Sequence, residues 1–247
     1  MKFHPRWAIT VLFVVASGVS TLVHAASVSG QGTWETTLQG RDLDGNLSTA
    51  EAYYDTALNI TWLADANYAG TTMSWTTAIA WVASLNPYGS GITGWRLPTV
   101  TDTDTPGCND AYSSTDCGFN VDTATGKMAH MFYTTLGDKA AYDTSGTLQA
   151  GYGLTNTGPF SNVQSNDYWS ATGYAPDITG YAWYFNTNFG LQYFDYKADT
   201  LYAWAVHAGD VGVAVTASTV PVPAAAWLFG SGLAGLFGFA RRRARPA

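Results

Sequence analysis

The spacing of apolar residues in the first half of the chain predicts one strand followed by one helix. Apolar side chains at alternate positions, Leu58, Ile60 and Trp62, are typical of a strand. From Ser74 the spacing becomes helical, and the apolar residues that share one helix face are Trp75, Ala78, Ile79, Val82 and Leu85. Ser74 is a favoured N-cap residue and Asn86-Pro87 ends the pattern, so we expect a helix between them.

A second helix is predicted over about residues 124–136. The residues that share its buried face are Met128, Met131, Phe132 and Thr135. Gly137 follows directly and can serve as the C′ residue that ends the helix.

The last third of the chain predicts antiparallel strands. Trp183 and Phe185 occupy alternate positions, residues 186–190 have turn chemistry, and residues 191–196 return as a second strand. Residues 201–207 are apolar or aromatic on both faces, which predicts a central, buried strand. Two helices, short antiparallel strands and long loops together predict a single loop-rich α+β domain.

The pattern at the amino-terminal end is typical of a targeting segment and not of a folded domain. Lys2 and Arg6 precede an apolar stretch over residues 7–15, and Val23-His24-Ala25 supplies the small residues expected before a cleavage point. We therefore predict a secretory signal peptide over residues 1–25 and a folded body over residues 26–213.

The carboxyl-terminal tail has three parts in a fixed order. A spacer with a proline motif occupies residues 214–223, an uncharged apolar run occupies residues 224–240, and a basic cluster occupies residues 241–247. The apolar run is at the short end of what spans a bilayer, and basic clusters stay on the cytoplasmic side. The residues of the proline motif are Val220, Pro221, Val222 and Pro223.

This tail resembles the PEP-CTERM sorting signal that Gram-negative bacteria use with an exosortase. The resemblance implies that exosortase and the inner membrane are partners before processing. It also implies that the tail is cut near Pro221 to Pro223 and that the body reaches the cell surface or extracellular matrix. An ordinary carboxyl-terminal membrane anchor over residues 224–240 is the alternative.

Removing both ends makes the body strongly acidic. Five basic residues remain against all 18 acidic residues, which leaves a net charge of −13. A surface of this charge repels phosphate and sulfate backbones, which argues against nucleic-acid and heparin-like partners. It is compatible with neutral glycans, cationic partners or calcium.

The two cysteines of the chain, Cys108 and Cys117, lie close together in the sequence. Export places them in an oxidising compartment, so we predict a disulfide that closes a short loop. A two-cysteine metal site is the alternative, but no histidine lies near enough in the sequence to complete its ligands.

Several segments of the body resemble the Lcl C-terminal domain family. These segments are Gly94-Trp95-Arg96-Leu97-Pro98-Thr99, the preceding helix with its two tryptophans, and Tyr168-Trp169-Ser170-Ala171-Thr172. The resemblance runs from about residue 55 to 209. The Trp-Arg-Leu-Pro-Thr turn is also similar to a segment of C-type-lectin-like domains, so a fold of that type is implied. A sulfated ligand known for the family's named member does not suit this acidic body.

Three aromatic residues of these segments have two interpretations. Tyr168, Trp169 and Trp183 either form the framework of the core, as bulky aromatics in strands usually do, or face a sugar. Arg96 is expected to be held by a carboxylate or by carbonyls and stacked on an aromatic ring.

Residues 40–51 resemble the spacing of an EF-hand calcium loop. The oxygen-bearing residues of this pattern are Asp42, Asp44, Asn46, Ser48 and Glu51. The first ligand position is Gly40, and no flanking helices are evident, so a solvated Asp-Gly turn is the alternative. The sequence thus offers calcium as a possible cofactor.

The residues of the body do not assemble a known catalytic motif in sequence. His130 and His207 are its two histidines, and no Gly-x-Ser-x-Gly elbow accompanies them. We therefore predict an exported, non-catalytic surface or matrix protein that binds glycan or exopolysaccharide. A carbohydrate-active enzyme with paired carboxylates and a purely structural matrix protein are the alternatives.

Overall fold

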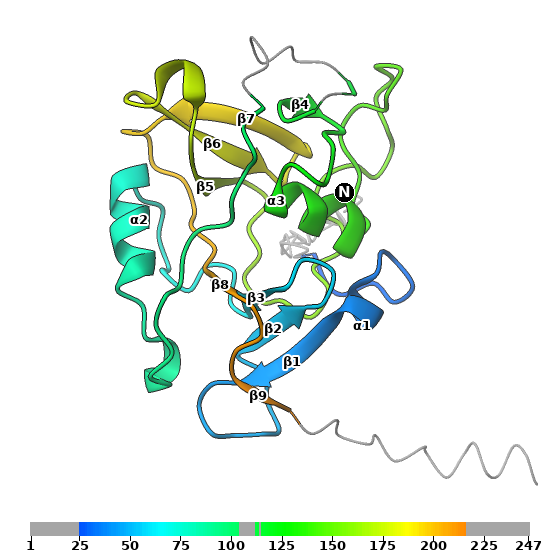
Figure 1. Cartoon of the computed structure of the whole chain (residues 1–247). Coiled ribbons are helices and arrows are strands. Elements are labelled where there is room, and N and C mark those ends of the chain that lie inside the picture. The colour runs from blue at the N-terminus through cyan, green and yellow to red at the C-terminus, as the bar shows by residue number, and fades with distance from the viewer. Residues whose placement is uncertain (1–24, 104–111, 114, 216–247) are drawn as a thin grey trace, which may run out of the picture.

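The computed structural model of the chain describes residues 25–103, 112–113 and 115–215 (Figure 1). Residues 1–24 of the predicted signal peptide, Cys108 and the tail from residue 216 lie outside this part. Within it, two antiparallel sheets accompany a few short helices, which confirms the predicted α+β class. No helix of the described part is both long enough and apolar enough to cross a membrane.

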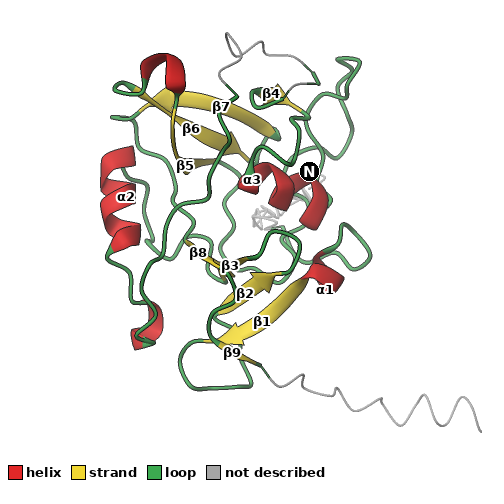
Figure 2. Ribbon diagram, viewed as in Figure 1, coloured by secondary structure: helices red, strands yellow, loops and turns green. Residues whose placement is uncertain are grey.

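The first sheet has five strands in the order β8-β3-β2-β1-β9, and it occupies the lower half of the molecule in Figure 2. Its strands are β1 (Leu38–Asp42), β2 (Ala52–Asp55), β3 (Ile60–Leu63), β8 (Val206–Ala208) and β9 (Val213–Ala214). All four residues of β3 are buried, which confirms the strand predicted from the alternation around Ile60.

The second sheet has four strands in the order β4-β7-β6-β5, and it occupies the upper half of Figure 2. Its strands are β4 (Gly118–Phe119), β5 (Asp167–Gly173), β6 (Tyr181–Asn186) and β7 (Leu191–Tyr196). The predicted hairpin is confirmed, because β6 and β7 pair through six residues on each strand. The Asn186 side chain closes the turn by accepting a hydrogen bond from the Phe189 amide at 2.7 Å.

Both predicted helices are present but shorter than expected. Helix α2 (Trp75–Ala83) begins after Ser74, whose hydroxyl accepts a hydrogen bond from the Thr77 amide at 3.4 Å, so the predicted N-cap is confirmed. The second helix is α3 (Lys127–His130), and it continues as a π-helical turn, η2 (Met131–Thr135). The four residues predicted to share its buried face are buried.

Three short helical segments have no counterpart in the sequence-based prediction. They are α1 (Trp34–Thr37), η1 (Pro87–Gly89) and η3 (Ala175–Asp177). None exceeds four residues, so their sequences carry no helical period.

The segment over residues 201–207 is buried as predicted, but its predicted place as a central strand is wrong. Its last residues belong to β8, which is an edge of the five-stranded sheet, while Tyr202 forms a bridge with Tyr168 of the other sheet. The segment therefore passes between the two sheets. The Trp204 ring packs edge-on against Trp62 and Phe160 at 4.9 Å each. A segment that passes between two sheets is buried on both faces, just as a central strand would be.

Candidate binding surfaces

The three aromatic residues considered as sugar contacts lie in the core. Tyr168 and Trp169 are 0% exposed and Trp183 is 1% exposed. The Trp169 ring nitrogen donates to the Met73 carbonyl at 2.9 Å, and that of Trp183 donates to the Asp102 carboxylate at 3.0 Å. None of the three presents a ring face to a ligand. The interpretation that they face a sugar is therefore wrong, and they belong to the framework of the core.

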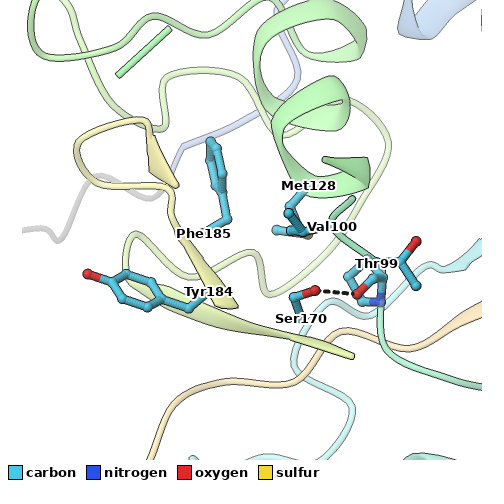
Figure 3. Close-up of a pocket in the computed structure, with 7 residues that line it drawn as sticks. Thr99, Val100, Met128, Ser170, Tyr184 and Phe185 are labelled. Carbon is cyan, nitrogen blue, oxygen red and sulfur yellow. Dashed lines mark hydrogen bonds between the residues drawn. The ribbon is translucent and has the colours of Figure 1, made fainter. Parts of the chain in front are cut away.

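The two motifs that carry the family resemblance are bonded to one another. The Ser170 hydroxyl donates to the Pro98 carbonyl at 3.0 Å, a bond drawn as a dashed line in Figure 3. The small cavity beside it is lined in part by Val100, Met128 and Tyr184, and it is too narrow to admit a water molecule. This junction therefore joins two elements and offers no space to a ligand.

Arg96 is held mainly by backbone contacts. Its amide and carbonyl each bond to Val206 at 2.8 Å, and its guanidinium donates to the Leu97 carbonyl at 3.2 Å. Burial lowers the pKa of Arg96. The expected hydrogen bond from Arg96 to a carbonyl is thus present, and the role of Arg96 is structural.

The predicted calcium loop connects β1 to β2, and it brings three carboxylates together. Asp42, Asp44 and Glu51 each offer an oxygen, and these oxygens all lie within 4.8 Å of one another. Asp42 and Glu51 are buried, whereas Asp44 is exposed. Calcium is commonly bound by oxygens at about 2.3–2.6 Å from the ion, so oxygens this close to one another can share one ion.

The same side chains also fold the loop by themselves. One Asp42 oxygen accepts the amides of Asp44 at 2.9 Å and Gly45 at 2.8 Å, and Glu51 accepts the Leu43 amide at 3.1 Å. The remaining two predicted ligands bond to each other, since the Ser48 hydroxyl donates to the Asn46 side chain at 2.6 Å. The residues suit a calcium site, and they equally suit the solvated turn.

A surface that the sequence analysis did not identify lies on the outer part of β6 and β7. We call it the aromatic shelf, and its residues are Tyr174, Tyr181, Phe194 and Tyr196. Tyr174 stacks on Phe194 with ring centroids 3.9 Å apart, and Tyr181 lies 4.3 Å from Tyr196. Tyr181 also meets Phe194 edge-on at 5.5 Å, so the four rings are continuous. Tyr196 is 56% exposed, and the other three are partly exposed.

The register of the hairpin builds this shelf. Tyr181 pairs with Tyr196 and Trp183 pairs with Phe194 across the two strands, so their side chains share one face of the sheet. The predicted turn over residues 186–190 could have given this register. The contribution of Tyr174 could not be foreseen, because it comes from the loop between β5 and β6.

That loop is fixed to the body from two sides. The Lys197 ammonium donates to the Ile178 carbonyl and lies 4.1 Å from the centre of the Trp75 ring. On the other side, the Asp102 carboxylate accepts the Ala175 amide at 2.7 Å. Ile178, in the same loop, is 62% exposed. The β5–β6 loop, which begins at Tyr174, is therefore held against the body.

Acidic residues lie on the elements that carry the shelf. Asp177 lies in the β5–β6 loop, whereas Asp195 on β7 pairs with Ala182 and therefore faces the opposite side of the sheet from the rings. The Asp199 amide donates to the Tyr196 carbonyl at 2.9 Å. Burial, together with the nearby Asp199, raises the pKa of Asp195. A hydrogen bond with Tyr196, together with burial and the neighbouring charges, raises the pKa of Tyr181 to about 12, so this phenol is neutral at physiological pH.

Both histidines of the body have structural contacts. The His207 ring nitrogens lie 2.7 Å from the Ala208 carbonyl and 3.0 Å from the Thr93 carbonyl. His130 lies 3.4 Å from the Thr135 hydroxyl, and burial lowers its pKa while Asp55 acts in the opposite direction. Asp55 itself accepts the amides of a turn.

Cys117 is the one cysteine that lies among the described residues. It is 2% exposed and is not a free thiol. Its expected partner, Cys108, lies outside the described residues, so the pairing of the two stays a prediction.

A family model described as the Lcl C-terminal domain matches residues 51–207. The matched range contains both resemblance motifs and the whole aromatic shelf. Of the three clustered carboxylates it contains Glu51 alone, and it ends before β9. No curated protein matches the chain.

Proposed function

Because the chain belongs to the Lcl C-terminal domain family, we propose that it is an exported surface or matrix protein that binds glycan without catalysing a reaction. The proposal includes processing by an exosortase at the inner membrane. It also includes the finer fold assignment, a C-type-lectin-like domain, for which the support is the Trp-Arg-Leu-Pro-Thr turn.

The observation that carries glycan binding is the aromatic shelf. A pyranose ring has an apolar face of C–H groups and a rim of hydroxyls, and aromatic ring faces bind such a face while nearby polar groups bind the rim. The exposed ring of Tyr196 offers the first kind of contact, and the exposed carboxylate of Asp177 in the β5–β6 loop offers the second. The fixed β5–β6 loop lowers the entropic cost of binding, since less chain must be ordered.

The position of β9 supports export with late removal of the tail. β9 pairs with β1, and the Val215 amide still donates to the Gly40 carbonyl at 3.3 Å. The folded body thus extends to within a few residues of the Val220 to Pro223 motif. A cut near Pro221 would leave every described strand in place.

Co-sedimentation with the producing cell's own exopolysaccharide tests this function. The protein would be the processed form, residues 26–219, in calcium and in EDTA. We expect sedimentation with the polysaccharide and its loss in Tyr196→Ala. Tyr152→Ala is the matched control, because Tyr152 is an exposed tyrosine that stacks on Phe189 outside the shelf.

The other outcomes separate the competing functions. Absence of sedimentation in both conditions, for the unaltered protein, would overturn glycan binding. Self-association without glycan would instead support a structural matrix role. Degradation of the polysaccharide that stops when one carboxylate is neutralised would support an enzyme.

A further inference from the structure

The last described strand, β9, is held on the body by few contacts. It forms an edge of the five-stranded sheet and pairs with β1 (Figure 1). Both of its residues are exposed. The Val215 amide adds one more backbone bond, to the Gly40 carbonyl at 3.3 Å. An edge strand this short, with no buried side chain, opens locally at a low cost in free energy.

One ion pair adds to these contacts. The Arg41 guanidinium donates to both carboxylate oxygens of Asp210, at 2.6 and 2.8 Å. It also donates to the Gly40 carbonyl at 2.9 Å and lies 5.4 Å from the centre of the Tyr54 ring. Arg41 is therefore fixed to the first sheet, and its bond to Asp210 ties the chain before β9 to that sheet.

Two further contacts bound the segment that can open. The buried Thr61 hydroxyl donates to the Gly209 carbonyl at 2.8 Å, which fixes the chain at that point. A β-carbon on Gly212 would lie 2.9 Å from the Asp42 carbonyl oxygen, so the chain passes directly across the end of β1. We call residues 210–215 the terminal latch.

The closed latch keeps the predicted cut close to the body. Five residues, 216–220, link Val215 to Pro221, and a chain of that length spans at most about 20 Å. A body of about 190 residues has a radius of gyration of about 16 Å, which is similar to that reach. Opening the latch as far as Gly209 extends the reach to about 40 Å.

A folded body so close to the cut bond obstructs a protease, which binds an extended stretch of its substrate. Resting on the proposed processing at the inner membrane, we propose that the terminal latch sets the rate of tail removal. The enzyme engages the tail when the latch is open, so the rate follows the population of the open form. The cut hydrolyses one peptide bond near Pro221. Water adds its oxygen to the carbonyl carbon and the leaving nitrogen takes a proton, so no group of the body takes part.

Pulse-chase labelling of the full chain in the producing cell measures the rate of tail removal, as a loss of mass on a gel. Asp210→Asn removes the charge of the pair and keeps the size of the side chain. We expect it to shorten the half-time by up to about fivefold, which is the largest effect of an exposed ion pair on an equilibrium. Asp122→Asn, at an exposed aspartate of another loop, is the matched control and should leave the half-time unchanged.

Two further variants close and bypass the latch. A β-carbon on residue 40 would lie 2.7 Å from Val215 Cγ2, so Gly40→Cys with Val215→Cys can join β1 to the latch by a disulfide. This pair should slow tail removal by about tenfold or more, because it removes the open form, whereas each single cysteine variant should not. A six-residue insertion after Ser218 lengthens the link while the latch stays closed. It should give the faster rate with or without Asp210→Asn.

The outcomes separate the latch from the processing on which it depends. Equal half-times in the unaltered protein, in Asp210→Asn and in the cysteine pair would overturn the latch and leave processing intact. An effect of Asp210→Asn that persists in the lengthened chain would also overturn it, because reach would not be limiting. Absence of tail removal from the unaltered protein would overturn both. Circular dichroism would confirm that each variant is folded.

Discussion

Tyr181 and Tyr196 lie directly opposite one another on β6 and β7, with ring centroids 4.3 Å apart and ring planes inclined by 35°. The pair lies at the end of the hairpin that is remote from its turn, next to the β5–β6 loop. Tyr196 is more than half exposed, so it supplies ring surface that no described side chain covers.

The ring of Tyr196, and not its hydroxyl, should account for glycan affinity. Tyr196→Ala should weaken glycan binding about two- to tenfold, because one aromatic contact contributes about 0.5–1.5 kcal/mol. Tyr196→Phe should retain most of the affinity. It should also lower the pKa of Tyr181 from about 12 toward its ordinary value, since the hydrogen bond between the phenols is lost.

Titration of tyrosinate absorbance and calorimetry together check this prediction. If Tyr196→Phe weakens binding as much as Tyr196→Ala does, the hydroxyl and not the ring face carries the contact. Unaltered binding in both variants would remove Tyr196 from the site.

The elements that could be predicted from the sequence are those with a clear local period. β3, α2 and the β6–β7 hairpin follow from apolar spacing and a cap or turn at one end. β1 could not be predicted, because the Leu38–Asp42 segment has no alternation of apolar and polar residues. The edge position of residues 201–207 also could not be predicted, since burial on both faces comes from a second sheet.

The exposure of the aromatic residues at the candidate site also could not be predicted from the sequence. Trp183 and Tyr181 lie two positions apart on one strand and share a face, yet Trp183 is buried and Tyr181 is partly exposed. What separates them is the packing of distant residues, such as Val100 and Cys117, against Trp183. The sequence shows that a strand has an aromatic face, but it does not show where the covering layer stops.

Asp138 should make the protein less stable as pH rises. One of its oxygens accepts four hydrogen bonds, from Gln31, from Thr155 twice and from Asn156, while the other is buried without a described partner. Burial raises the pKa of Asp138 from 3.8 to about 6. The unfolded state therefore loses its proton first, and stability is lost between about pH 4 and pH 6. At neutral pH the whole of this loss of stability is therefore present.

Urea unfolding of Asp138→Asn at pH 4 and pH 7.5 measures this effect. A pKa shift of this size corresponds to roughly 2–3 kcal/mol. The stability of the variant relative to the unaltered protein should therefore be greater at pH 7.5 than at pH 4 by that amount. Asparagine keeps the accepting oxygen, so the hydrogen bonds themselves are a smaller difference. A stability difference that is the same at both pH values would contradict the raised pKa.

The β1–β2 loop allows the calcium hypothesis to be tested without activity. If calcium binds Asp42, Asp44 and Glu51, calcium at 100 times its dissociation constant should raise the free energy of unfolding by about 2.7 kcal/mol. Glu51→Gln should abolish this gain while keeping an oxygen for the Leu43 amide. Asp143→Asn is the control, because Asp143 also closes an exposed turn with its own side chain.

Denaturant unfolding in calcium and in EDTA gives the readout. Equal stability of the unaltered protein in both solutions would favour the solvated turn. An equal calcium effect in Glu51→Gln would place the ion elsewhere.

The ion pair between Arg41 and Asp210 should hold the last strand on the body. The guanidinium donates to the two carboxylate oxygens at 2.6 and 2.8 Å, and each partner shifts the other's pKa toward the charged form. Asp210 precedes β9, and its side chain is 46% exposed, so solvent screens the pair. Asp210→Asn should therefore cost only about 1 kcal/mol of global stability.

The local effect should be larger than the global one, because β9 has two residues and both are exposed. Hydrogen exchange should show faster exchange at the Val215 amide, which bonds to Gly40, while the amides of β3 stay protected. Asp210→Glu should restore part of the protection, since it keeps the charge. Unchanged exchange at Val215 in Asp210→Asn would mean that backbone pairing with β1 alone holds the strand, and that the ion pair does not control the junction with the tail.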